Sequence, residues 1–257
     1  MLSRRASLWI AGLLVVVLTA PLALSAQRRG FFGGGGRYRG YVLPNVPYDG
    51  QFTFARIRYL GRDSWDADYP LMERNLTTML EALTSIRPHT EGSNVHTFDD
   101  PELLKYPVAY LTEPGYWYPT DAEVEGLRRY LDKGAFLIVD DFHFENEWNV
   151  FEHGIRRALP NHSIVPLEVT HPVFNTFFKI ESLRVPYPGR FGEQGLMGEF
   201  YGMFKDNDPS QRLMVVINYN MDIGDYMEWS HTGTYAGVPT NEAYKFGINY
   251  IIYGLTR

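Results

Sequence analysis

The feature that most constrains the fold of this chain is the apolar segment Gly134-Ala135-Phe136-Leu137-Ile138-Val139, which ends in Asp140 and Asp141. A continuous apolar run that follows a glycine and ends in polar residues is typical of a buried strand in a parallel sheet. In open α/β sheets, ligands bind outside the carboxyl ends of such strands. The sequence therefore predicts a parallel α/β domain and directs the search for a functional site to this pair of carboxylates.

The first 26 residues have the pattern of a secretory signal peptide. Arg4 and Arg5 form a basic segment, and residues 8–24 are almost wholly apolar. Small residues follow and end at Ala26, which is a suitable position for cleavage. The alternative is an uncleaved membrane anchor, which the short apolar run and its interruption by Pro21 disfavour. We expect a secreted or periplasmic protein that touches a membrane only if cleavage fails.

The composition of the chain limits which binding partners and which catalytic groups it can have. Removal of a segment with two arginines and no acids moves the formal net charge from −6 to −8. A chain this acidic is a poor ligand for nucleic acid or anionic lipid. The sequence has no cysteine, which excludes both a disulfide framework and a cysteine nucleophile. An exported chain without disulfides fits the bacterial envelope, and we expect no nucleic acid partner.

Beyond the leader, a Gly-rich tether over residues 27–51 precedes a single α/β domain over residues 52–257. Thr120 and Glu123 form a capping box that begins a helix, and Gly134 ends that helix just before the apolar strand. Strand, helix and strand in this order imply right-handed crossovers and a central, mostly parallel sheet. Strands are expected at residues 52–59, 95–98, 106–111, 135–139, 196–204 and 212–218, and helices at residues 72–83, 120–131, 148–159, 172–178 and 243–251.

Several short segments occur in a recognisable order along the domain, namely Phe54-Ala55-Arg56-Ile57-Arg58-Tyr59, Tyr106-Pro107-Val108-Ala109-Tyr110-Leu111-Thr112, Leu127-Arg128-Arg129-Tyr130-Leu131, the strand ending in Asp140-Asp141, His171-Pro172-Val173-Phe174 and Gly247-Ile248-Asn249. Their order and spacing resemble the bacterial domain of unknown function family 4159. The resemblance implies a three-layer, flavodoxin-like fold of the class I glutamine amidotransferase-like type.

Amidotransferases of that branch carry a cysteine at a strand-to-helix turn. The corresponding turn in this chain reads Glu113-Pro114-Gly115-Tyr116-Trp117 and offers no nucleophile of that kind. The resemblance therefore implies the fold and a set of pocket residues, and it implies no amidotransferase chemistry.

Asp140 and Asp141 are the first candidates for the functional site. Because side chains alternate along a strand, only one of them can easily face a cleft, and the other is expected to cap a helix or bond turn amides. His143 and Glu145 follow Asp141 at spacings of two residues. These side chains are suitable ligands for zinc or another divalent cation. A structural role for the carboxylates is favoured, and no metal or other cofactor is assigned.

Three further residues complete the candidate pocket. Glu113 ends the strand expected beside Asp140, and the two could form an acid/base pair, although an exposed loop carboxylate is the favoured interpretation. Trp117 could stack on a ligand or pack on the sheet edge. His171 could return to the same rim as a base, a ligand or a cap partner, or be a plain loop histidine. Polar atoms of residues 219–222 end another strand and could complete the rim.

Two functions from different classes are consistent with these residues. The first is a noncatalytic envelope domain that binds a small molecule, a glycan or an envelope protein, motivated by export, the missing nucleophile and the polar, aromatic rim. The second is a carboxylate-dependent hydrolase, metal-assisted in one version, which uses Asp140 or Asp141 with Glu113 and His171 on an envelope or glycan substrate. A structural component of an assembly is a third interpretation. Whether the chain is an enzyme stays open.

Overall fold

The structure, a computed structural model, describes residues 42–60 and 64–257. The expected signal peptide and the first part of the expected tether lie outside the described residues. The strands are β1 (Ala55–Ile57), β2 (Asn94–His96), β3 (Val108–Thr112), β4 (Phe136–Asp140), β5 (Val165–Pro166), β6 (Glu199–Phe204) and β7 (Leu213–Tyr219). The α-helices are α2 (Leu71–Leu83), α3 (Asp121–Asp132), α4 (Phe144–Ala158), α5 (Arg190–Glu193), α6 (Ile223–Glu228) and α7 (Gly237–Thr256). Within these residues no helix is both long and apolar enough to cross a membrane.

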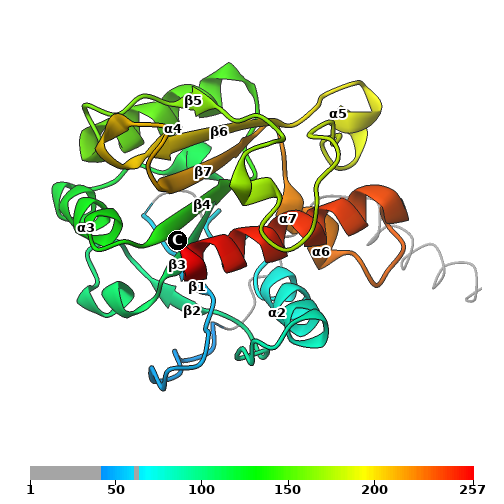
Figure 1. The fold of residues 1–257 in the computed structure, drawn as a ribbon, viewed down its shortest axis with the longest axis horizontal. Coiled ribbons are helices and arrows are strands. Elements are labelled where there is room, and N and C mark those ends of the chain that lie inside the picture. The colour runs from blue at the N-terminus through cyan, green and yellow to red at the C-terminus, as the bar shows by residue number, and fades with distance from the viewer. Residues whose placement is uncertain (1–41, 61–63) are drawn as a thin grey trace, which may run out of the picture. The chain divides into compact units, whose positions relative to one another are not determined.

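The described strands form one sheet in the order β2-β1-β3-β4-β7-β6-β5 (Figure 1). Strands β2, β1, β3, β4 and β7 pair in parallel, whereas β6 runs antiparallel to both β7 and β5. The expected α/β class and its central, mostly parallel sheet are therefore confirmed. The five parallel strands end at the same edge of the sheet, so the residues that follow them are brought together there.

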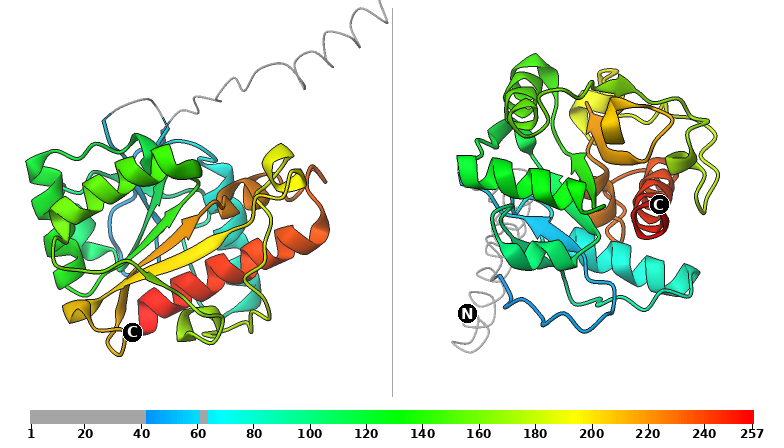
Figure 2. Two further views of the ribbon diagram at one scale, coloured as in Figure 1. Left: turned by 90° about the horizontal axis from the view of Figure 1, so that it is seen from above. Right: turned by 60° about the vertical axis from the view of Figure 1, so that its left-hand side comes forward.

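Helices cover both faces of this sheet and form a three-layer arrangement (Figure 2). Helices α3 and α4 lie on one face, and α2, α6 and α7 lie on the other. Side chains of β4 alternate between two apolar cores. Phe136 and Ile138 belong to the core under α2 and α7, while Leu137 and Val139 belong to the core under α3 and α4. The same alternation directs Asp140 toward the side of α2, α6 and α7.

The helix before β4 begins and ends as the sequence predicts. The hydroxyl of Thr120 accepts a hydrogen bond from the Glu123 amide at 3.2 Å, and the Glu123 carboxylate accepts one from the Thr120 amide at 2.8 Å. This reciprocal pair is the predicted capping box, and it satisfies amides that have no partner inside the helix. Gly134 has a φ of +110°, a conformation that glycine adopts more readily than other residues. Both boundaries are confirmed.

The second half of the domain differs most from the sequence pattern. Helix α4 begins at Phe144, four residues before the expected start at Trp148. The expected helix over residues 172–178 is reduced to a 3-10 helix over Pro172–Phe174. Beyond it, two backbone amides donate to a side chain of α7 instead of continuing a helix. Helix α6 is absent from the sequence expectations because six residues are too few to show a helical period.

Candidate functional site

Asp140, the last residue of β4, occupies a closed hydrogen-bonded site. Its Oδ2 atom accepts from the Tyr110 hydroxyl at 2.6 Å and from the amides of Ile223 and Gly224 at 2.9 and 3.2 Å. Its Oδ1 atom accepts from the Asn218 amide group at 2.9 Å. Burial raises the pKa of Asp140 to about 6, although these hydrogen bonds act in the opposite direction. Asp140 therefore fixes the start of α6 to the ends of β3, β4 and β7.

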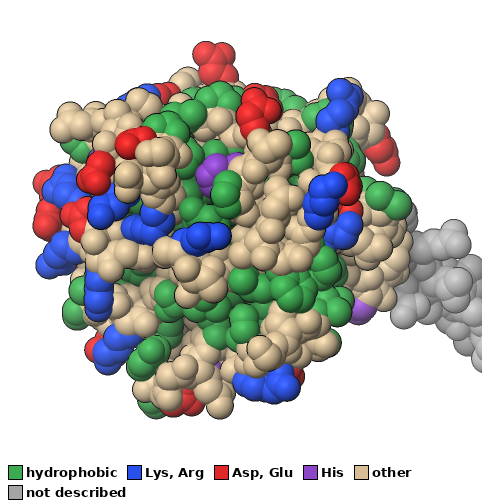
Figure 3. All heavy atoms as spheres, viewed as in Figure 1, with side chains coloured by type: hydrophobic (Ala, Val, Ile, Leu, Met, Phe, Trp, Pro, Cys, Tyr) green, Lys and Arg blue, Asp and Glu red, His purple; other side chains and the backbone are tan. Residues whose placement is uncertain are grey.

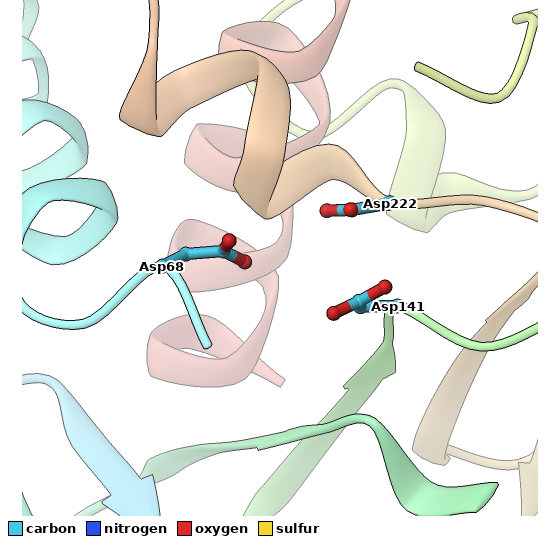
Figure 4. A group of neighbouring side chains, drawn as sticks. All are labelled: Asp68, Asp141 and Asp222. Carbon is cyan, nitrogen blue, oxygen red and sulfur yellow. The ribbon is translucent and has the colours of Figure 1, made fainter. Parts of the chain in front are cut away.

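A second group of carboxylates lies at the same edge of the sheet. Its oxygens are not all satisfied by hydrogen bonds, as those of Asp140 are. Oxygens of Asp68, Asp141 and Asp222 all lie within 4.8 Å of one another (Figure 4). Asp68 belongs to the segment between β1 and α2, Asp141 directly follows β4, and Asp222 follows β7. The parallel topology thus brings together three acids that are far apart in the sequence.

Helix α6 adds two acids to this group. Asp222 caps the helix, because its Oδ1 atom accepts from the Asp225 amide at 2.7 Å. The spacing of three residues then places Asp225 and Glu228 along one side of the helix. Oxygens of Asp68, Asp225 and Glu228 also lie within 4.8 Å of one another. We call the five residues Asp68, Asp141, Asp222, Asp225 and Glu228 the carboxylate cluster.

The electrostatics of the carboxylate cluster disfavour full ionisation without a counter-charge. Burial raises the pKa of Asp68, Asp141 and Asp222 well above the ordinary aspartate value, and neighbouring carboxylates raise it further. Burial and then the charge of Asp225 raise the pKa of Glu228 to about 7. Holding protons or binding a cation would relieve this cost.

Arg56 supplies positive charge close to the cluster, but it is paired with another acid. This fully buried arginine of β1 donates from Nε to the Glu73 carboxylate at 2.6 Å. Its guanidinium lies over the ring of Tyr110, 4.9 Å from the centroid, and its charge lowers the pKa of Asp68 against the larger effect of burial. Since Glu73 is not a member of the cluster, Arg56 offsets only part of the cluster's negative charge.

The donor atoms and the space around Asp68 fit a hard divalent cation. Carboxylate oxygens are the ligands that Mg²⁺, Ca²⁺ and Mn²⁺ prefer. Oδ2 of Asp68 is buried and accepts no hydrogen bond from any described residue. A Cβ at Gly224 would lie 2.3 Å from that atom, so only glycine leaves room beside it. A buried carboxylate oxygen without a donor is expected where a cation binds, and Gly224 lets the start of α6 approach that oxygen closely.

Two members of the cluster adopt the left-handed backbone conformation. The φ angles are +61° for Asp68 and +59° for Asp141. Aspartate tolerates this region better than most residues, but the conformation is uncommon and is concentrated at functional sites. At Asp141 it ends the strand alternation, so Asp141 reaches the same edge as Asp140. The expectation that only one of the pair would face this region applies to a regular strand, which ends at Asp140.

His143 and Glu113 lie around the cluster rather than in it. The His143 ring packs 5.1 Å from the ring of Tyr187, whose hydroxyl donates to Asp141 at 3.3 Å. The charge of Glu113 raises the pKa of Asp141, and the Glu113 carbonyl accepts from Tyr59 at 2.8 Å. The structure thus relates Glu113 to Asp141 more closely than to Asp140, its expected partner.

Trp117 and His171 lie away from the carboxylate cluster. Trp117 is fully buried in the α3/α4 core, where its ring packs against Phe98 with centroids 5.7 Å apart. His171 packs beside Phe204 and Tyr253, with centroid distances of 5.7 and 6.2 Å. The Tyr253 hydroxyl accepts from the first amide of β7, so His171 lies at the opposite edge of the sheet. His171 therefore does not converge with Asp140, Asp141 and Glu113, as the hydrolase alternative requires.

The sequence patterns do not single out Asp68, Asp225 or Glu228. Asp68 lies in a loop without periodicity, and nothing local in the sequence indicates that it meets the ends of β4 and β7. For α6 a signal exists, because acids at positions 222, 225 and 228 follow a predicted strand at a helical spacing. Glu145, which the sequence grouped with Asp141 and His143, is exposed.

These features define a mixed α/β protein with a carboxylate cluster at the carboxyl edge of its sheet. A family model described as a domain of unknown function (DUF4159) matches residues 53–255. Because the match covers most of the chain, the protein belongs to this family, as the resemblance predicts. A comparison with curated proteins gives no match. Membership of this family assigns no activity to the chain.

Proposed function

We propose that this domain binds a hard divalent cation, Mg²⁺, Ca²⁺ or Mn²⁺, through Asp68, Asp141 and Asp222. The observation that carries the proposal is the convergence of three carboxylates from three separate segments within 4.8 Å. Buried like charges at this distance are costly, and a bound cation removes that cost. The proposal differs from the ligands expected of a noncatalytic domain, namely a small molecule, a glycan or an envelope protein, and takes up the divalent cation considered for the hydrolase alternative.

The wider context of the proposal is an exported domain with an amidotransferase-like fold. The parallel order β2-β1-β3-β4, with helices on both faces, supports a flavodoxin-like fold of the class I glutamine amidotransferase-like type. Glu113 occupies the turn after β3, where that branch carries its cysteine, which supports a noncatalytic role. The N-terminal sequence pattern supports a place in the bacterial cell envelope.

Calorimetric titration of the full, chelator-treated chain with Mn²⁺, Mg²⁺ and Ca²⁺ tests the proposal. We expect saturable binding of at least one of these ions. Asp141→Asn and Asp222→Asn each remove one charged ligand while keeping the side chain's size, and each is expected to weaken binding roughly tenfold or more, because affinity depends on ligand charge.

The matched control is Asp132→Asn, which removes the same charge from an exposed position at the end of α3. This variant is expected to bind the ion as the wild type does. Absence of binding for all three ions would contradict the proposal. Unchanged affinity in both Asp141→Asn and Asp222→Asn would contradict the assignment of these ligands.

A further inference from the structure

The carboxylate cluster consists of two ligand groups that share one residue. Asp68, Asp141 and Asp222 form the first group, and Asp68, Asp225 and Glu228 form the second. We infer that the cluster holds two divalent cations bridged by the carboxylate of Asp68. This inference rests on the proposed function and adds to it a second ion, the ligands of that ion and the bridging residue.

Asp68 has the position that a bridging carboxylate requires. Its side chain faces Asp141 and Asp222 across the site (Figure 4), and its oxygens are also within reach of the α6 acids. Oδ2 is buried and accepts no hydrogen bond from any described residue, so this atom is available as a ligand. The two oxygens of one carboxylate can bind two ions, which lie about 3.5–4 Å apart in known two-metal sites.

The charge of the cluster gives a separate reason for a second ion. One cation held by the first group would leave Asp225 and Glu228 beside it without a counter-charge of their own. Arg56 fills this role only in part, because its charge acts on Glu228 and Asp68 while its Nε donates to Glu73 at 2.6 Å. Two divalent ions would balance most of the charge of the five acids.

Helix α6 is organised to hold the second group of ligands in place. The Asp225 carboxylate accepts from the Trp229 indole at 3.1 Å and from the Tyr235 hydroxyl. Hydrogen bonds of this kind orient the ligands of metal sites. Gly224 lies in the first turn of the helix and has no Cβ. A Cβ at this position would lie only 2.3 Å from Oδ2 of Asp68.

Titration with Mn²⁺ distinguishes one ion from two, because calorimetry gives the stoichiometry and paramagnetic resonance reports spin coupling between neighbouring ions. The full wild-type chain is expected to bind two Mn²⁺ ions and, at saturation, to show the spectrum of a coupled pair. Glu228→Gln is expected to bind one ion and to show an uncoupled spectrum. Glu125→Gln, which alters an exposed glutamate paired with Arg128 on α3, is the matched control and should bind two.

The outcomes separate this inference from the proposed function. One ion per wild-type chain, with the same stoichiometry in Glu228→Gln, overturns the second ion and leaves the first site intact. No binding of Mn²⁺, Mg²⁺ or Ca²⁺ overturns both. The wild-type stoichiometry decides the question even if Glu228→Gln fails to fold.

Discussion

At the scale of single residues, two adjacent aspartates differ because the backbone changes between them. Asp140 is the last residue of a regular strand, and both of its oxygens accept hydrogen bonds from buried donors. Asp141 has a φ of +59°, and its carboxylate turns toward Asp68 and Asp222. The first aspartate therefore stabilises the fold, and the second is available to a ligand.

Replacement of Asp140 tests this division of roles. Asp140→Ala removes the acceptor for Tyr110, Asn218 and two backbone amides. An unsatisfied buried donor costs about 1–3 kcal/mol, so we expect the free energy of unfolding to fall by about 3 kcal/mol or more. Chemical denaturation measures this change, with the exposed Asp132→Ala as the control. A loss below about 1 kcal/mol would show that the donors find other partners.

The same residues show how far a sequence can predict this site. Asp140 and Asp141 are found because a long apolar strand leads directly to them. Asp68 is not found, because its place depends on a left-handed backbone conformation and on contacts with segments more than 70 residues away. The position of His171 stays open at the sequence level, because the sequence does not indicate at which edge of the sheet its loop returns. Local patterns predict strand ends, whereas convergence of loops is a tertiary property.

At the scale of elements, strong local signals predict helix boundaries and weak ones do not. Helix α3 begins and ends as predicted because its capping box and Gly134 act within one turn of the chain. Helix α6 has only six residues, and its N-terminus is fixed by hydrogen bonds to the distant Asp140. It therefore leaves little signal in the sequence, although it carries two of the five cluster acids.

Gly126 in α3 tests how closely this helix must approach the chain after β2. A Cβ at Gly126 would lie 2.0 Å from the carbonyl oxygen of Phe98. Although alanine favours a helix by about 1 kcal/mol over glycine, we expect Gly126→Ala to lower the urea midpoint of unfolding. In Gly237→Ala the added Cβ meets no atom within 4 Å, so this control should be neutral or stabilising. A Gly126→Ala variant as stable as the wild type would contradict the close approach.

At the scale of the whole molecule, charge is distributed unevenly. On the face shown in Figure 3, acidic and basic side chains are interspersed around the margin, and apolar side chains gather over α7 and α2. At the carboxyl edge of the sheet, by contrast, five acids are concentrated within a few side-chain lengths of one another. We therefore expect this edge to control how the stability of the protein depends on pH.

The direction of that dependence follows from the raised pKa values. Burial raises the pKa of Asp140 from 3.8 to about 6, and burial with charge repulsion raises that of Glu228 to about 7. Between about pH 4 and pH 7 the folded state holds protons that the unfolded chain releases, so its stability falls as pH rises. Burial lowers the pKa of His171, and this change alone makes stability rise with pH. The several carboxylates with raised pKa values outweigh this single imidazole.

Thermal melting of the full chain with a chelator or with Mn²⁺, at about pH 5 and about pH 8, tests the central claim most directly. With the chelator we expect the melting temperature to be several degrees lower at the higher pH, because one pKa unit is worth about 1.4 kcal/mol and each kcal/mol moves it by about 2–4 °C. Mn²⁺ should restore the melting temperature at the higher pH and have little effect at the lower, where protons occupy the carboxylates. A melting temperature that changes with neither pH nor Mn²⁺ would contradict a cation site at the carboxylate cluster.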